Sequence, residues 1–142
     1  MSVLYTSIAR FHDREVLVEC TECEGNVQSV AREIIKEIGN KGFSTIEANN
    51  KYMYAFMVDD HMIYFCMCFK QDHPQVSAFL GKVRKEFEAR FSYDDEPSKV
   101  SKFQAKLKTL MREYNSKDNK LDAVDMELAK LESEVIETNS RI

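Results

Sequence analysis

The spacing of apolar residues along the first part of the chain predicts both helices and strands. Between residues 26 and 38 the apolar residues recur at the spacing of a helix with a wide apolar face: Val27, Val30, Ala31, Ile34, Ile35 and Ile38. Asn26 can serve as the N-cap of this helix, and Gly39 can supply a left-handed stop. We expect this wide face to contact a sheet and a second surface.

Five shorter segments are rich in β-branched and aromatic residues and end at turn residues, as strands do. They are residues 2–10, 14–20, 43–50, 51–60 and 61–70. Two further helical stripes follow, one from Val76 to Phe91 and one from Val100 to Tyr114 after Pro97. Runs of adjacent strands with helices gathered around them predict an α+β fold with a mainly antiparallel sheet.

The C-terminal stretch "LDAVDMELAKLESEVIETNSRI" has a different, narrower apolar seam. Its positions alternate in steps of three and four residues, as in a helix that packs against partner helices. They are Leu121, Val124, Leu128, Leu131, Val135, Thr138 and Ile142. The seam predicts that this stretch meets a partner helix.

Composition narrows the class of protein. The chain has 142 residues, enough for one domain with its own core and a short appendage. A net charge of -4 gives no support to nucleic-acid binding, which normally uses a strongly basic patch. The N-terminus lacks the features of a secretory signal, which predicts a cytosolic chain, and the most apolar run, "HMIYFCMCF", is only strand-length.

Catalytic and metal-binding motifs are missing from the sequence. None of the four glycines stands in a phosphate-binding motif, and the three histidines belong to no metal motif, so we expect no enzymatic activity and no cofactor. Cys20 and Cys23 form a C-x-x-C pair that can bind zinc or undergo redox chemistry. We favour reduced, metal-free cysteines, with Cys66 and Cys68 buried together on one face of a central strand.

The basic residues of the third helix admit two interpretations. Lys99, Lys102, Lys106, Lys108 and Arg112 could meet phosphates or anionic lipid headgroups. We favour an ordinary exposed helix surface.

In order and pattern, these segments resemble the longin-domain vesicle SNAREs, the synaptobrevin-like class. "VLYTSIAR" resembles the opening strand of that family, "LVECTECEGNVQSVAREIIKEI" its second strand and first helix, and "YMYAFMVDDHMIYFCMCF" its central hairpin. "AFLGKVRKEFEARF" is similar to the second helix of the family. The resemblance implies a longin (profilin-like) fold over residues 1–116: a five-stranded antiparallel sheet with the helix at 26–38 on one face and the two later helices on the other.

Residues 117–142 then resemble a hinge and the N-terminal half of a SNARE motif, with the seven seam residues as its layers. The central arginine of the family would fall three places after Ile142, and Arg141 is out of register for that role. We therefore expect the chain to be part of a longer protein that continues to a membrane anchor. The "LVECTECEGN" region favours an endosomal type of longin SNARE over the type that acts between the endoplasmic reticulum and the Golgi.

The resemblance implies a vesicle R-SNARE in membrane traffic and fusion. Its partners would be Q-SNARE helices in a four-helix bundle, and its place the cytoplasmic face of vesicle, endosomal or Golgi membranes, with membrane contact only through the anchor. A longin-like adaptor subunit of a coat or tethering complex is the alternative, and a small metal or redox protein using Cys20 and Cys23 is a third reading.

Longin SNAREs have a groove between the first helix and the third strand that receives their own SNARE segment or a trafficking regulator. Onto this groove we place the matching residues Val27, Ala31, Ile34, Phe43 and Thr45. The two-residue alternation of a strand sets Phe43 opposite the face of Ser44 and Ile46, so we expect its ring to point outward.

Overall fold

The computed structural model describes residues 3–23 and 25–116. The predicted seam residues, from Leu121 to Ile142, and the hinge before them lie outside this part of the chain. In chain order, the elements are β1 (Val3–Arg10), β2 (Val16–Thr21), α1 (Val27–Glu37), β3 (Gly42–Glu47), β4 (Tyr52–Val58), β5 (Met62–Phe69), the 3₁₀ turn η1 (Lys70–Asp72), α2 (His73–Arg90), α3 (Pro97–Val100), the 3₁₀ turn η2 (Ser101–Phe103) and α4 (Gln104–Ser116).

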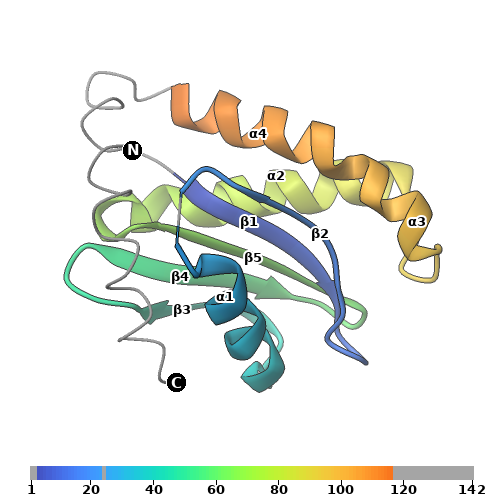
Figure 1. Ribbon diagram of the computed structural model, residues 1–142, viewed down its shortest axis with the longest axis horizontal. Helices are drawn as coiled ribbons and strands as arrows, with labels where there is room; N and C mark the ends of the chain where they lie inside the picture. Colours follow the sequence, from blue (N-terminus) through green and yellow to red (C-terminus); the bar gives the residue numbers. More distant parts are fainter. Residues whose placement is uncertain (1–2, 24, 117–142) are drawn as a thin grey trace.

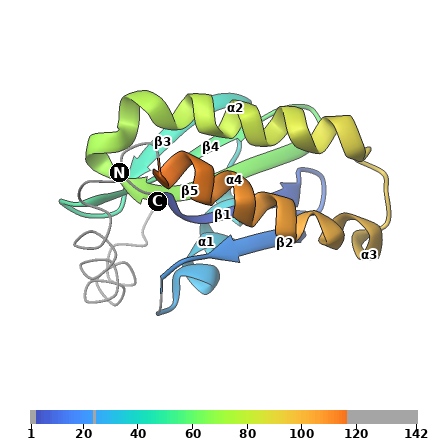
Figure 2. The ribbon, with the colours of Figure 1, turned by 90° about the horizontal axis from the view of Figure 1, so that it is seen from above.

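The strands form one antiparallel sheet in the order β2-β1-β5-β4-β3. Helix α1 covers one face, whereas α2 and α4 cover the other, α2 over β4 and β5 and α4 over β1 and β2 (Figures 1 and 2). This arrangement confirms the predicted fold class. The third helical stripe begins at Pro97 as expected, but it is divided into α3, η2 and α4.

Side chains from the two sheet faces build two separate apolar cores. Along β5, all eight residues are buried: Ile63, Phe65 and Met67 join the core under α1, whereas Tyr64, Cys66 and Cys68 join the core under α2 and α4. Both Cys66 and Cys68 are 0% exposed. The predicted burial of these two cysteines on one face is confirmed.

The ends of α1 are built differently from the sequence prediction. Asn26 stands at the N-cap position, but its side chain makes no capping hydrogen bond. Gly39 is not left-handed; α1 ends because Ile38 is extended. The Arg14 guanidinium, from the turn between β1 and β2, donates instead to the carbonyl oxygens of Ile35 (3.1 Å) and Ile38 (2.5 Å). A cation on the last carbonyls of a helix stabilises its end, so a left-handed glycine is not needed there.

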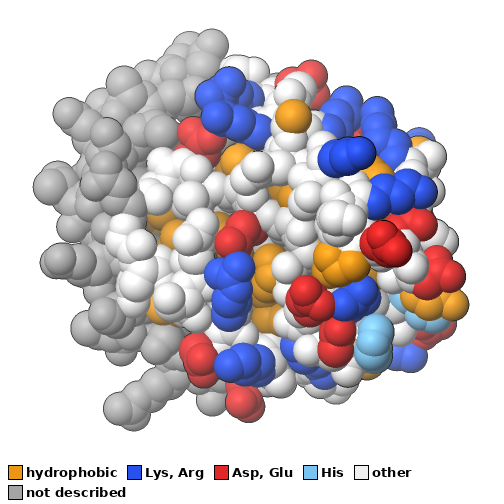
Figure 3. All heavy atoms as spheres, turned by 45° about the vertical axis from the view of Figure 1, so that its right-hand side comes forward, with side chains coloured by type: hydrophobic (Ala, Val, Ile, Leu, Met, Phe, Trp, Pro, Cys, Tyr) orange, Lys and Arg blue, Asp and Glu red, His pale blue; other side chains and the backbone are white. Residues whose placement is uncertain are grey.

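The surface of the described domain carries mixed charge. Figure 3 shows acidic and basic side chains interspersed over one face. Among the basic residues of the third helical stripe, Lys99 pairs with Asp95 (3.6 Å) and Lys106 with Glu86 (3.9 Å). In the described part of the chain, no helix is long and apolar enough to cross a membrane.

Candidate interaction surface

Helix α1 uses its apolar stripe to hold the helix on the sheet. Val27, Ala31 and Ile34 are 1%, 0% and 1% exposed, and all three belong to the core between α1 and the sheet. These three predicted groove residues are therefore buried under α1 and do not lie on the protein surface. The exposed face of α1 consists of polar residues: Gln28, Ser29, Arg32, Glu33, Lys36 and Glu37.

Strand β3 is an edge strand and the most exposed strand of the sheet. It pairs with β4 on one side, and no strand of the described chain pairs with its other side. The edge strand of a sheet presents unpaired backbone N–H and C=O groups to which another extended segment can add. Phe43 is 37% exposed, and among the described residues it and Tyr93 are the exposed large apolar side chains.

The pairing of β3 with β4 shows which face each predicted residue occupies. Residues directly opposite each other in an antiparallel pair point to the same face of the sheet. Phe43 lies opposite Met57 and Thr45 opposite Ala55, and both partners belong to the side covered by α2.

The other β3 positions face α1. Ser44 lies opposite Phe56 and Ile46 opposite Tyr54, and Ile46 packs partly against the α1-side core. The structure thus brings Val27, Ala31 and Ile34 together, but it separates them from Phe43 and Thr45, which lie across the sheet. Ser44 and Ile46 are the β3 residues that face α1. Neither was among the predicted groove residues.

Ion pairs flank the exposed edge. At the start of β3, the Lys41 Nζ lies 2.6 Å from Asp60 Oδ1, and this hydrogen bond lowers the pKa of the Asp60 carboxyl. At the other end, Lys70 Nζ lies 3.0 Å from Glu47 Oε2. Charges at the ends of an edge strand disfavour indiscriminate pairing with other strands, so they restrict which segments can add to β3.

The two cysteines of the C-x-x-C pair near β2 are buried in different cores. Cys20 joins the core under α4, whereas Cys23 joins the core under α1. Burial raises the pKa of both thiols, whereas a reactive cysteine needs a lowered pKa. In the described ranges, no group of three or more His, Cys, Asp or Glu side chains could hold a metal ion.

Comparison with known proteins gives two findings. The model of the Longin family, described as a regulated-SNARE-like domain, matches residues 17–115. The chain is also 24% identical over 137 residues to "Vesicle-associated membrane protein 7B" of Dictyostelium discoideum, a match that covers 93% of the chain and 52% of that relative. The chain thus spans about half the length of this curated relative.

Proposed function

Because this chain belongs to the longin family of regulated-SNARE-like domains, we propose that it is the N-terminal regulatory part of a vesicle R-SNARE. In this proposal, residues 1–116 form the longin domain and residues 117–142 form the hinge and the first half of the SNARE motif. The similarity to a vesicle-associated membrane protein supports this assignment. The seven seam residues would then be layers that zip with Q-SNARE helices at the cytoplasmic face of vesicle, endosomal or Golgi membranes.

The regulatory step we propose is that the SNARE segment folds back on the longin domain beside β3. Phe43 on the open edge of β3 is the observation that carries this proposal, because an apolar ring and unpaired backbone groups stand together there. Most helical stability in proteins comes from packing of an apolar face, so a SNARE segment without partner helices would gain stability by docking. Docking would cover its apolar seam until partner helices arrive.

The free energy gained by covering Phe43 is small, so the docked contact would be reversible. Fully burying a large apolar side chain stabilises by about 1.5–3 kcal/mol. Phe43 has only 37% of its surface still exposed, so covering it would add roughly 0.5–1 kcal/mol. A contact of this size can be displaced by the many layers of a four-helix bundle.

The test compares two exposed aromatic residues in the 142-residue chain. Phe43→Ser should speed amide hydrogen exchange across residues 121–142 and leave exchange in β1, β4 and β5 unchanged. Tyr93→Ser is the matched control, because Tyr93 is 47% exposed but lies in the loop after α2 and not on the sheet edge. Equal exchange in the tail of both variants and the parent would mean that the segment does not dock on Phe43.

A further inference from the structure

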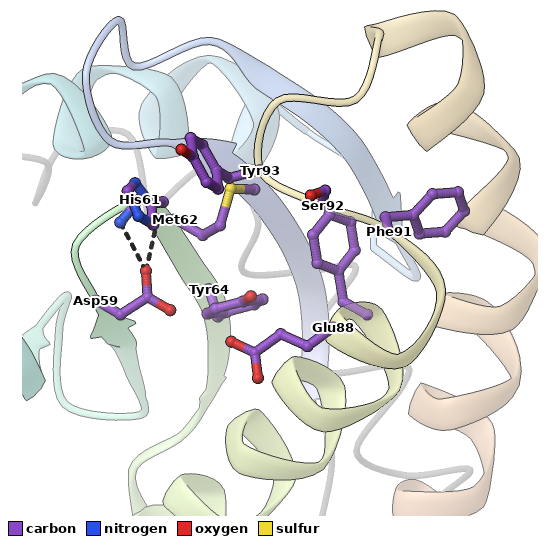
Figure 4. Close-up of a pocket in the computed structure, with 9 residues that line it drawn as sticks. Asp59, His61, Met62, Tyr64, Glu88, Phe91, Ser92 and Tyr93 are labelled. Carbon is purple, nitrogen blue, oxygen red and sulfur yellow. Dashed lines mark hydrogen bonds between the residues drawn. The ribbon is translucent and has the colours of Figure 1, made fainter.

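A small hollow lies at the end of the sheet, where the turn between β4 and β5 meets the C-terminal end of α2 (Figure 4). Its volume is about 190 Å³, which equals the share of roughly six water molecules. Polar and aromatic side chains from both elements line it, among them Asp59, His61, Tyr64, Glu88 and Tyr93. The hollow is the size of one long amino-acid side chain.

Tyr64 is one of the residues that line this hollow. Tyr64 is 0% exposed, and within the described chain its buried hydroxyl makes no hydrogen bond. Asp59 and Glu88 line the same hollow (Figure 4). Burial, together with these carboxylates, raises the pKa of Tyr64, so the phenol stays neutral and can both accept and donate a hydrogen bond. A buried polar group of this kind gains stability when a ligand supplies the missing hydrogen bond.

The charges around the hollow favour a cation. Asp59 Oδ2 lies 3.4 Å from Arg84 Nε, and Glu88 Oε2 lies 3.1 Å from the same nitrogen. Two carboxylates thus share one guanidinium, which leaves a net negative charge beside the hollow. The C-terminal end of α2, which stops at Arg90, adds the partial negative charge of a helix end.

The rim of the hollow offers a flat aromatic surface. The rings of His61 and Tyr93 stack with centroids 3.7 Å apart and an angle of 6° between their planes. Planar guanidinium groups stack on aromatic faces and donate several hydrogen bonds in fixed directions, whereas an ammonium is a compact point charge. A guanidinium therefore fits both the rim and the carboxylates better than an ammonium does.

We propose that this hollow binds an arginine side chain of a partner protein. The guanidinium donates to the Tyr64 hydroxyl oxygen and pairs with Glu88, while the His61–Tyr93 stack flanks its plane. Asp59 shapes the site, because its Oδ1 accepts hydrogen bonds from the backbone N–H groups of His61 (2.8 Å) and Met62 (2.7 Å). The proposal does not rest on the SNARE role.

The first test titrates the 142-residue chain with N-acetyl-arginine methylamide and follows backbone amide signals by NMR. We expect saturable shifts confined to residues 59–64 and 87–93. N-acetyl-citrulline methylamide has nearly the same shape without the charge and should give no saturable shift, and the lysine analogue should bind more weakly than the arginine one. Equal responses to the arginine and citrulline probes would overturn the proposal.

Two variants and one control separate the site from general attraction to an acidic protein. Glu88→Gln should weaken binding of the arginine probe by a factor of about two to five, the range expected for a half-exposed ion pair. Tyr64→Phe keeps the buried ring and should weaken binding about two- to tenfold, the value of one hydrogen bond. Glu33→Gln removes an exposed carboxylate on α1 that pairs with Lys36 at 3.5 Å, and it should leave binding unchanged. An equal loss in Glu33→Gln and Glu88→Gln would show nonspecific binding and refute the site.

Discussion

Two buried tyrosines allow the same substitution to be tested in opposite settings. Tyr5 and Tyr54 are both 0% exposed. The Tyr5 hydroxyl donates to Glu19 Oε1 at 2.7 Å, whereas the Tyr54 hydroxyl has no hydrogen-bond partner within the described residues. Leaving a buried hydroxyl unpaired costs about 1–3 kcal/mol, so Tyr54→Phe should raise the free energy of unfolding by about 1–2 kcal/mol. Tyr5→Phe should lower it by about 1–2 kcal/mol, because it removes a hydrogen bond to a charged group.

The assay is urea unfolding at neutral pH, followed by circular dichroism, with the slope of the unfolding free energy against urea checked for constancy. Opposite signs for the two variants are the expected result. If both substitutions destabilise the protein by similar amounts, the Tyr54 hydroxyl is already satisfied and the reasoning from its unpaired state is wrong.

We expect these two tyrosines, together with Tyr64, to make the folded protein less stable at alkaline pH. Burial raises the pKa values of Tyr5, Tyr54 and Tyr64 in the folded protein. The unfolded chain ionises its tyrosines near pH 10, so this stabilisation is complete below about pH 10 and is lost as the pH rises further. Each tyrosine should contribute a slope of about 1.4 kcal/mol per pH unit above that point. Tyr54→Phe should reduce the slope of the unfolding free energy against pH by about 1.4 kcal/mol per pH unit. An unchanged slope would contradict the raised pKa of Tyr54.

Two further predictions concern α1 and the cysteines. Arg14→Ala should lower the free energy of unfolding by about 1–2 kcal/mol, the value of a partly buried cation at a helix C-terminus. Arg14→Lys should restore only part of this loss. Urea unfolding measures both variants, and an Ala variant as stable as the parent would show that Arg14 does not stabilise the end of α1. Cys66 and Cys68 should resist a thiol reagent in the native protein and react after unfolding, as seen by mass spectrometry, whereas rapid native modification of both would contradict their burial.

The sequence predicted the elements well where the signal is local. The run from Met62 to Phe69 is apolar at almost every position because β5 lies in the middle of the sheet with helices on both faces. The end of α1 was not predictable in this way. Its carbonyl partner is Arg14, which precedes Ile35 by 21 residues, and no local pattern links a turn residue to a distant helix end.

The candidate surfaces show the same division. Alternation along β3 was enough to separate Phe43 from Ser44 and Ile46, but it does not say which of the two faces α1 covers. That choice depends on the pairing of β3 with β4 and on the packing of α1, which bring together residues far apart in the chain. The hollow beside Tyr64 was not predicted, because its two walls come from residues 59–64 and 87–93, which are distant in the sequence.

The layers of the fold explain why both candidate surfaces lie at its margins. Helices cover both faces of the sheet, so the side chains that point inward are committed to the two cores. The edge at β3 and the end of the β4–β5 hairpin are two of the places that stay open in the described chain. The strand pairings place Phe43, Met57 and Tyr64 in one row across β3, β4 and β5 on the face covered by α2. Neighbouring strands are about 4.8 Å apart, so Phe43 and Tyr64 lie roughly 10 Å from each other along this row. The two candidate surfaces therefore lie near each other on the same side of the sheet, although Tyr64 itself is buried in the core under α2.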